Sequence, residues 1–567
     1  MTKAQPDPIL LTLFENRFMS VAEAMGKSLR QTAISTNIKE RLDFSCAIFA
    51  ADGDLVANAP YIPIHLGSMS FAVKYQLKLH AKSLKEGDVL MTNSPRAGGS
   101  HLPDITIITP VFSPDEKSKI MFFTASRGHH ADVGGISPGS MPPTSTTIFD
   151  EGAQIVSFKI VDDGIYQRDQ LLDFMCTQPA KYAGSSGCRN FKDVESDLKA
   201  QIAANHKGVR LIHALIEEYG QNTVKEYMDH IRDNAESSVR NLLREVVDRL
   251  GTTDLKATDH LDDGTPICLS ISINKSEGSA VFDFEGTGPE VRGNLNAPIS
   301  VVHSAIIYCL RSMLNSEIPL NSGCLVPITV KIPGDTLLSP SDTAAVCAGN
   351  VLTSQRIVDV ILKAFDACAA SQGCTNNLTF GEGGKDASGI VKAGWGYYET
   401  IAGGSGAGPD WHGTSGVHTH ITNTRIGDLE ILERRYPLIL HRFELREGSG
   451  GKGEFNGGDG VIREFEFLQK MQVSILSERR SRQPYGLHGG NPGKSGRNLW
   501  IKQLREEDGD LPEQTRNPAE GDLPPNKPRV INIGGKATVM MGKGDRFIIE
   551  TPGAGGWGAP TQPTEKV

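Results

Sequence analysis

The chain contains the segment Gly98-Gly99-Ser100-His101-Leu102-Pro103-Asp104 and, a little further on, Ser126-Arg127-Gly128-His129-His130-Ala131-Asp132. Between them, Ile105–Phe112 and Ile120–Ala125 are rich in β-branched and aromatic residues and flank a polar turn at Ser113–Lys119. This pattern is typical of two strands joined in a hairpin. Because a hairpin places the start of its first strand beside the end of its second, we expect the histidines and carboxylates of the two segments to meet.

The side chains that meet at this end of the hairpin are of the kinds that bind divalent metals. His101 and Asp104 would face His129, His130 and Asp132. Mixed imidazole and carboxylate ligands suit Mn, Zn or Fe better than Ca or Mg. Three protein ligands would leave one position for water or substrate, as in catalytic metal sites. A single His or Asp near a strand end is usually a solvated loop residue or a cap, so the prediction depends on the whole group.

The composition is that of a globular protein. The chain has 567 residues, of which 38% are hydrophobic and 22% charged, and this length predicts roughly two to four domains. The net charge of −9 and the absence of a long basic run argue against a nucleic-acid partner. The apolar stretches are too short to span a membrane, and the polar N-terminus is unlike a secretory signal.

The nine cysteines are scattered along the chain without a Cys-x-x-Cys pair. This irregular spacing predicts reduced thiols and a cytoplasmic location. Their scatter also argues against a disulfide framework.

The order of predicted elements indicates a mixed α/β, or α+β, multidomain fold with mixed sheets. We expect an N-terminal metal-site domain at 1–250 that ends in a helical segment, an α/β middle domain at 251–380, and a glycine-rich, β-rich domain at 381–567. The helical spacing of apolar residues is clearest near the end of the first domain, and Gly251 is expected to end that helix. A charged, proline-rich stretch at Glu506–Arg529 predicts a surface loop.

Around His65, residues Pro60–Met69 are expected to form an irregular loop that is followed by a helix from about Phe71 to Ser83.

A second candidate site lies in the C-terminal third. Gly403–Gly408 is glycine-rich, and backbone amides in such a loop can hold a carboxylate or a phosphate. His418 and His420 alternate as two residues on one face of a strand do. The alternative is a polar strand end, and neither segment has the spacing of a P-loop or a dinucleotide-binding motif. The residues expected to contact substrate are Gly404, Gly406, His418, His420 and Arg425.

Several longer segments resemble the hydantoinase B/oxoprolinase family, in the order in which that family carries them. They are Arg41–Cys46, His65–Met69, Gly98–Asp104, His129–Gly135, Gly349-Asn350-Val351 with Ser354-Gln355-Arg356, and Gly451–Gly453 with Gly457–Gly460. The resemblance extends from about residue 8 to residue 560. Within the family, Trp411–Arg425 and Pro484–Gly490 are most similar to the C-terminal half of ATP-dependent 5-oxoprolinase.

The resemblance implies a division of labour between two proteins or two domains. A hydantoinase A-type ATPase with an actin-like fold would bind Mg-ATP and phosphorylate the substrate, and the B-type part would complete the reaction. The sequence has no nucleotide-binding motif of its own, so we expect a hetero-oligomer with such a partner. Asp7-Pro8 at the start and the final glycine motif are expected to bound a complete B-type unit.

The family also implies roles for individual residues. Related acetone carboxylases hold a metal through a His-x-x-Asp and a later His, which correspond here to His101, Asp104 and His129. Because His129 and His130 are adjacent, His130 is an alternative to His129 as the third metal ligand. We expect the metal to be Mn or Zn. His65, Asp132 and His130 are the candidate catalytic residues for proton transfer.

The expected activity is hydrolysis of a cyclic amide, 5-oxoproline to glutamate, a reaction of glutathione metabolism. Phosphorylation of the amide oxygen would create a better leaving group, and a metal would lower the pKa of the attacking water. Three alternatives remain open: an N-methylhydantoinase acting on a hydantoin, a component of a ketone carboxylase, and a scaffold without catalytic activity for the ATPase subunit.

Overall fold

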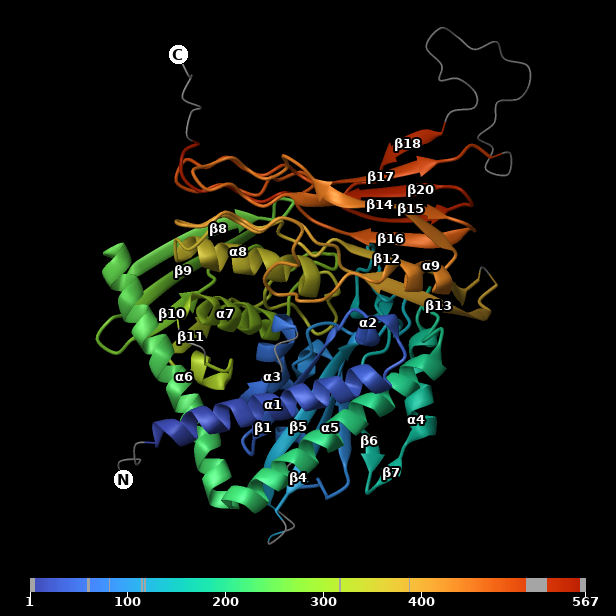
Figure 1. Cartoon of the computed structure of the whole chain (residues 1–567). Coiled ribbons are helices and arrows are strands. Elements are labelled where there is room, and N and C mark those ends of the chain that lie inside the picture. The colour runs from blue at the N-terminus through green and yellow to red at the C-terminus, as the bar shows by residue number, and fades with distance from the viewer. Residues whose placement is uncertain are drawn as a thin grey trace, which may run out of the picture.

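A computed structural model describes residues 6–560 apart from 59–61, 81, 114–115, 117–118, 316–317, 387 and 506–527. Within these residues the strands form four sheets, and helices cover two of them (Figure 1). The chain is therefore a mixed α/β protein with several sheets, as predicted. Nearly all of the predicted surface loop at Glu506–Arg529, and part of the predicted turn at Ser113–Lys119, lie outside the described residues.

The first sheet contains the predicted hairpin. Its strands run in the order β2-β1-β5-β4-β3-β6-β7 and all pair antiparallel. The pairing of β4 with β5 sets Asp104 opposite His129, so the hairpin brings the two segments together as expected. The strands are β1 Phe44–Ala50, β2 Leu55–Asn58, β3 Val89–Thr92, β4 Asp104–Phe112, β5 Ile120–His129, β6 Phe158–Asp162 and β7 Ile165–Tyr166.

Helices cover both faces of this sheet (Figure 1). The helices α1 (Pro8–Thr32) and α5 (Phe191–Tyr219) pack on one face, and α3 (Pro63–His80) packs on the other. The helix α3 corrects the prediction of an irregular loop at Pro60–Met69. Proline often indicates a loop, but Pro63 occupies the first helical position, where a backbone N–H has no helical partner to lose. His65 therefore lies in the first turn of a helix.

The helix α8 covers the second sheet, whose strand order is β11-β10-β9-β8, and α6 contacts the same sheet at β10. The helix α6 ends at Gly251, whose φ of 69° is the left-handed cap that the sequence predicted. The helix α7 packs between α3 and α8, and α8 packs on β8 and β9. These elements are α6 Gln221–Leu250, β8 Asp254–His260, β9 Pro266–Asn274, β10 Ser279–Asp283, α7 Ile299–Met313, β11 Ile328–Lys331 and α8 Ser354–Ala364.

The third and fourth sheets pack face to face and enclose a core of their own, which includes Phe380, Phe465 and Phe547. Their strand orders are β13-β12-β16-β19 and β14-β15-β20-β17-β18. The elements are β12 Asn377–Lys385, β13 Val391–Glu399, α9 Leu429–Arg435, β14 Leu438–Arg446, β15 Gly460–Phe467, β16 Met471–Leu476, β17 Arg497–Lys502, β18 Arg529–Asn532, β19 Lys536–Met541 and β20 Arg546–Glu550.

Short helical turns connect these elements. They are α2 Thr36–Lys39, η1 Pro95–Ala97, η2 Ile148–Asp150, α4 Arg168–Leu172, η3 Asp173–Thr177, η4 Pro179–Lys181, η5 Ser322–Leu325 and η6 Gly349–Thr353. The last of these, η6, is a π-helical turn that leads directly into α8.

A buried network of charged residues joins the second sheet, α8 and the segment after β16. Arg356 bonds Asp259 at 3.1 Å and Glu478 at 3.0 Å, and Arg479 bonds Asp259 at 2.7 Å and Asp359 at 3.1 Å. Both arginines are buried. The largest hydrophobic cluster likewise takes residues from all three predicted domains. The division at residues 250 and 380 stays a prediction.

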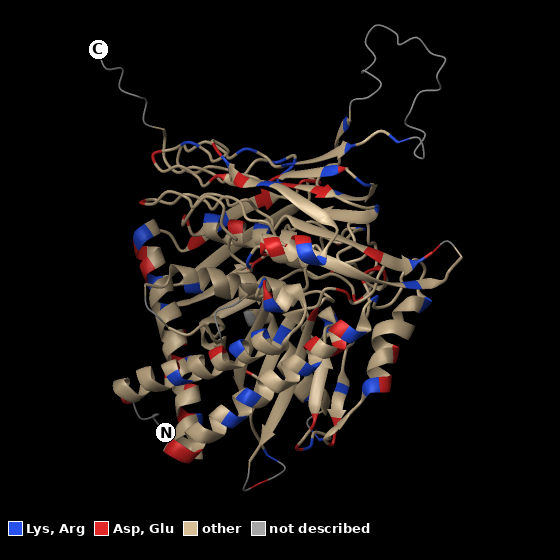
Figure 2. Cartoon of the chain, turned by 45° about the vertical axis from the view of Figure 1, so that its right-hand side comes forward, with Lys and Arg blue, Asp and Glu red and all other residues tan. Residues whose placement is uncertain are grey.

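On the outside of the molecule, Lys and Arg are interspersed with Asp and Glu along the helices (Figure 2). Among the helices of the described residues, none is both long enough and apolar enough to span a membrane.

Candidate metal centre

The loop before β4 is held in place by close backbone contacts that require its two glycines. Gly98 has φ of +85°, and a Cβ on Gly99 would come within 2.1 Å of the Asn93 carbonyl oxygen. The Ser300 hydroxyl on α7 donates to the Gly99 carbonyl at 2.9 Å, and the Arg127 guanidinium donates to the Gly98 carbonyl at 3.2 Å. These contacts fix the backbone of the loop, and the loop in turn positions His101 just before β4.

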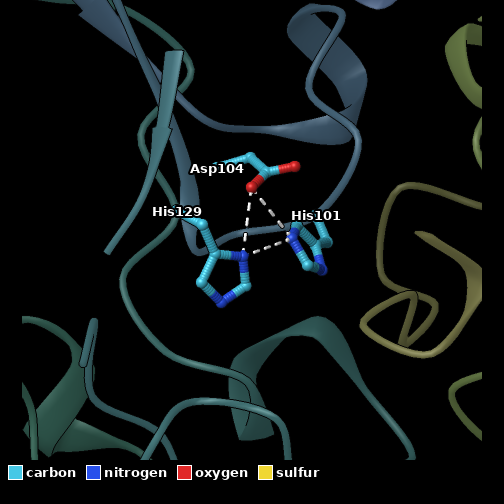
Figure 3. Close-up of side chains that lie close together, drawn as sticks. All are labelled: His101, Asp104 and His129. Atoms are coloured by element: carbon cyan, nitrogen blue, oxygen red, sulfur yellow. Dashed lines mark hydrogen bonds and ion pairs between the residues drawn. The ribbon is translucent and has the colours of Figure 1, made fainter. Parts of the chain in front are cut away.

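His101, Asp104 and His129 converge on one point (Figure 3). Asp104 Oδ1 lies 3.1 Å from His101 Nε2 and 3.2 Å from His129 Nδ1. The two imidazole nitrogens are 3.2 Å apart. All three residues are at most 1% exposed. The structure thus brings together the three residues that the sequence predicted as metal ligands.

These three atoms fit a divalent cation. A cation about 2.1 Å from each ligand atom keeps neighbouring ligand atoms roughly 3.0–3.4 Å apart, from octahedral to tetrahedral geometry. The observed separations of 3.1–3.2 Å lie within that interval. His101 Nδ1 is 3.3 Å from the Cys347 carbonyl oxygen, to which it donates, so Nε2 keeps its lone pair for a ligand bond.

Further polar groups surround Asp104. The Ser100 hydroxyl donates to Asp104 Oδ2 at 2.6 Å, and His65 Nε2 lies 3.4 Å from the same oxygen. The other ring nitrogen of His65 lies 3.1 Å from the Ser45 hydroxyl. The Asn350 amide nitrogen is 2.8 Å from His101 Nε2 and 3.3 Å from Asp104 Oδ2. His65 is therefore beside the cluster, within reach of the same carboxylate.

Burial and neighbouring groups set the protonation states here. Burial alone would raise the pKa of Asp104, but His101, His65 and the hydrogen bonds from the imidazoles hold it well below its usual value. Burial lowers the pKa of His129 to about 3, and it also lowers the pKa of His65. The carboxylate is thus ionised and these two imidazoles are neutral, which are the forms that bind metals and accept protons.

The wall behind His129 comes from segments that the sequence reasoning gave no role. The Tyr398 ring stacks on His129 with centroids 4.1 Å apart, and Arg41 Cζ lies 4.9 Å from the centroid of the Tyr398 ring. Asp43 accepts the His129 backbone N–H at 3.0 Å through its carbonyl, and its buried carboxyl, with the pKa raised to about 7 chiefly by burial, interacts electrostatically with Asp104. The motif Arg41–Cys46 was the available signal for Arg41 and Asp43.

His130 and Asp132 point to other partners. His130 Nε2 lies 2.9 Å from the Gln201 side chain on α5. Asp132 accepts hydrogen bonds from Arg189 at 3.2 Å and from the Gly134 backbone at 2.7 Å. Both residues line a separate cavity of about 410 Å³. This geometry favours structural roles for both, and their catalytic assignment stays a prediction.

His418 and His420 lie at a second location. Both line a cavity of about 850 Å³ between α6, α7 and the glycine-rich segment. His418 Nδ1 is 3.3 Å from the Thr400 hydroxyl, and His420 Nδ1 is 3.1 Å from the Tyr308 hydroxyl. Arg425 is exposed, and its backbone N–H and carbonyl bond Arg41.

The glycines at 403–408 allow backbone to pack on backbone. A Cβ on Gly404 would come within 2.1 Å of the Gly458 carbonyl oxygen, and one on Gly406 within 1.9 Å of the Ala369 carbonyl oxygen. The amides of residues 403–405, 407 and 408 already donate to protein carbonyls. Close packing therefore accounts for these glycines, and their role in binding substrate stays a prediction.

A mixed α/β fold with a buried His–Asp–His cluster at one end of a hairpin defines a protein with a candidate divalent-metal centre. The chain belongs to the hydantoinase B/oxoprolinase family, whose profile matches residues 7–560. This confirms the family that the sequence motifs indicated.

Individual relatives support the same assignment. The chain is 51% identical to 5-oxoprolinase 1 of Arabidopsis thaliana, over 98% of this chain and 42% of that protein. It is 50% identical to 5-oxoprolinase of Saccharomyces cerevisiae, over 97% of this chain and 42% of that protein. The chain thus spans about two fifths of the length of these curated relatives.

Among solved structures, the ATP-dependent caprolactamase from Pseudomonas jessenii has the same fold. The TM-score is 0.80 at 24% sequence identity, and the match covers 98% of this chain and 92% of that one.

Proposed function

We propose that the chain is the hydrolytic, B-type portion of an ATP-dependent cyclic amide hydrolase that converts 5-oxoproline to glutamate, and that it acts in the cytoplasm in glutathione metabolism. The observation that carries the proposal is the buried convergence of His101, Asp104 and His129 within 3.1–3.2 Å. The names of the relatives support the choice of substrate. The free thiols of the nine cysteines support the location.

An A-type ATPase is the partner in this proposal. It would bind Mg-ATP and phosphorylate the amide oxygen, in a hetero-oligomer or in a longer chain. The named relatives are more than twice as long as the segment they share with this chain, which leaves room in them for such a part. The name of the caprolactamase, which is ATP-dependent, is in keeping with the same requirement.

The metal cluster is the proposed site of hydrolysis. Mn²⁺ or Zn²⁺ held by His101, Asp104 and His129 would act as a Lewis acid and lower the pKa of the attacking water. The burial of the cluster excludes bulk water, so that a phosphorylated amide would meet only a positioned nucleophile.

His65 is the proposed proton acceptor. Its Nε2 is 3.4 Å from Asp104, Ser45 orients its other nitrogen, and burial keeps the ring neutral by lowering its pKa. In the tautomer whose proton is on Nδ1 and is donated to Ser45, the lone pair of Nε2 can take the proton of the attacking water. His418 and His420 are proposed to contact substrate from the wall of the larger cavity.

The test is ATP-dependent release of glutamate from 5-oxoproline by the chain together with an A-type ATPase, with each protein alone as a control. Metal content is measured on the same preparations. We expect activity only with both proteins, and about one metal ion per chain if the three ligands form one site. Unchanged glutamate release by the D104N variant, whose side chain has nearly the same shape, would refute the proposal.

A further inference from the structure

We propose that Asn350 completes the metal centre: when a divalent cation binds His101, Asp104 and His129, the side-chain amide of Asn350 turns over and its carbonyl oxygen faces the cation. The inference rests on the proposed metal site and adds to it a further residue and a conformational step. It gives a role to the Gly349-Asn350-Val351 motif, which had none.

The backbone at Asn350 is firmly placed. It belongs to the π-helical turn η6, and such turns are frequent at functional sites because they offset a side chain from the regular helical pattern. A Cβ on Gly349 would come within 1.9 Å of the Asn296 carbonyl oxygen, so only glycine fits before Asn350. The Ser354 hydroxyl donates to the Asn350 carbonyl one turn later. The side chain can therefore rotate while its Cα stays in place.

The side-chain amide touches two of the three ligands. Its nitrogen lies 2.8 Å from His101 Nε2 and 3.3 Å from Asp104 Oδ2. Its carbonyl oxygen is buried and has no hydrogen-bond partner among the described residues, and the whole side chain is 5% exposed. A buried amide oxygen without a partner is costly, so it marks a group that another state of the site would satisfy.

The hydrogen bond from Asn350 competes with a cation for the same electron pair. His101 donates through Nδ1 to the Cys347 carbonyl, so Nε2 is the acceptor of the ring. The lone pair on Nε2 either accepts the Asn350 N–H or binds a cation, and it cannot do both. Cation binding must therefore displace the Asn350 N–H from His101.

Rotation about the Cβ–Cγ bond resolves this conflict. That torsion is broad and roughly two-fold in asparagine, so a half-turn exchanges the nitrogen and the oxygen at little cost. The oxygen is then the atom that faces the cluster, and an asparagine carbonyl is a ligand for hard cations. An added oxygen ligand favours Mn²⁺ over Zn²⁺, which prefers four-coordinate nitrogen and sulfur sites.

The experiment measures Mn²⁺ and Zn²⁺ binding to the whole chain and to the N350A variant. Free Mn²⁺ is followed by electron paramagnetic resonance, and Zn²⁺ by competition with a chromophoric chelator. We expect N350A to weaken Mn²⁺ binding by about 10- to 100-fold, and Zn²⁺ binding by a smaller factor. The N350D variant, which supplies an oxygen in either orientation, is expected to bind Mn²⁺ at least as tightly as the unchanged chain.

Two controls keep the proposal open to refutation. The S354A variant removes a hydrogen bond in the same turn but leaves the amide, so it should retain Mn²⁺ affinity; an equal loss in S354A and N350A would show that only the turn matters. Mn²⁺ affinity within about two-fold of normal in N350A would also overturn the inference. Failure of the unchanged chain to bind either metal would instead overturn the proposed metal site itself.

Discussion

Two glycine-rich segments of this chain each precede a pair of histidines, and they build different structures. The loop at Gly98-Gly99 leads to His101 and His129, whose ring nitrogens lie 3.2 Å apart with Asp104 between them. The segment Gly403–Gly408 leads to His418 and His420, and each of these imidazoles bonds a different hydroxyl group. The difference is a shared carboxylate: Asp104 Oδ1 lies within 3.2 Å of both His101 and His129, whereas the carboxylate beside the second pair, Asp359, lies 3.7 Å from His420 Nε2.

The glycines of the two segments have the same packing role. In both, a Cβ would collide with a carbonyl oxygen, so in both the glycine permits close packing. At the metal cluster, His129 Nε2 and Asn350 Oδ1 have no hydrogen-bond partner among the described residues, and neither has His420 Nε2 at the second location, whereas the amides of residues 403–405, 407 and 408 donate to protein carbonyls. Unsatisfied polar atoms therefore occur at both histidine pairs, and the convergence of three ligand atoms is what distinguishes the metal cluster among the described residues.

The strongest test of this contrast removes the carboxylate. The D104A variant is expected to lose its metal and, with the ATPase present, to lose more activity than the roughly 10- to 100-fold that a supporting residue costs. The reason is that His101 and His129 would have no anion between them. Metal analysis and glutamate release check the result, with circular dichroism to confirm folding. A variant that retained its metal would place the centre elsewhere.

The next largest effect concerns His65. The H65A variant is expected to keep its metal but to lower kcat by about 10²- to 10⁴-fold, as loss of a general base does. Steady-state kinetics and metal content are measured together. Loss of metal in parallel with activity would assign His65 to ligand support instead of proton transfer.

A pair of alanine substitutions compares the two glycine-rich segments directly. Both G99A and G406A are expected to lower the free energy of unfolding by about 1–3 kcal/mol, because each new methyl group meets a carbonyl oxygen. Only G99A is expected to weaken metal binding as well, since its loop carries His101. Chemical denaturation and metal titration of the two variants give the comparison. Equal metal affinity in both would mean that the loop tolerates displacement.

The smallest expected effect belongs to the second histidine pair. If His418 contributes one hydrogen bond to substrate, H418A should raise KM by up to about 10-fold with kcat unchanged. The H441A variant, which changes a histidine on β14 outside both sites, is the matched control. A large fall in kcat for H418A would instead indicate that His418 takes part in the chemical step.

Much of the candidate site could be predicted because it is encoded locally. The pair His101 and Asp104 lies three residues apart at the start of one strand, and the hairpin register brings His129 to it. The end of the strand also explains why only one residue of the pair His129-His130 joins the cluster: His129 is the last residue of β5 and lies opposite Asp104, whereas His130 follows the strand and its ring bonds Gln201 on α5.

The rest could not be predicted because it depends on tertiary packing. Tyr398 and Asn350 approach the cluster from elements more than 200 residues away from it, and no spacing in the sequence indicates such a contact. The helix around His65 was missed for a local reason, since proline is compatible both with a loop and with a first helical turn. The packing role of Gly404 and Gly406 became visible only once Gly458 and Ala369 lay against them.

The buried charges around Arg356 and Arg479 have a consequence for how the chain melts. Arg356 and Asp359 lie before the predicted boundary at residue 380, and Glu478 and Arg479 lie after it. Separating these groups would strand buried charges at a cost of about 3–5 kcal/mol for a broken pair. Calorimetry is therefore expected to show the second sheet and the C-terminal sheets unfolding in one cooperative transition, even though the C-terminal sheets enclose a hydrophobic core of their own.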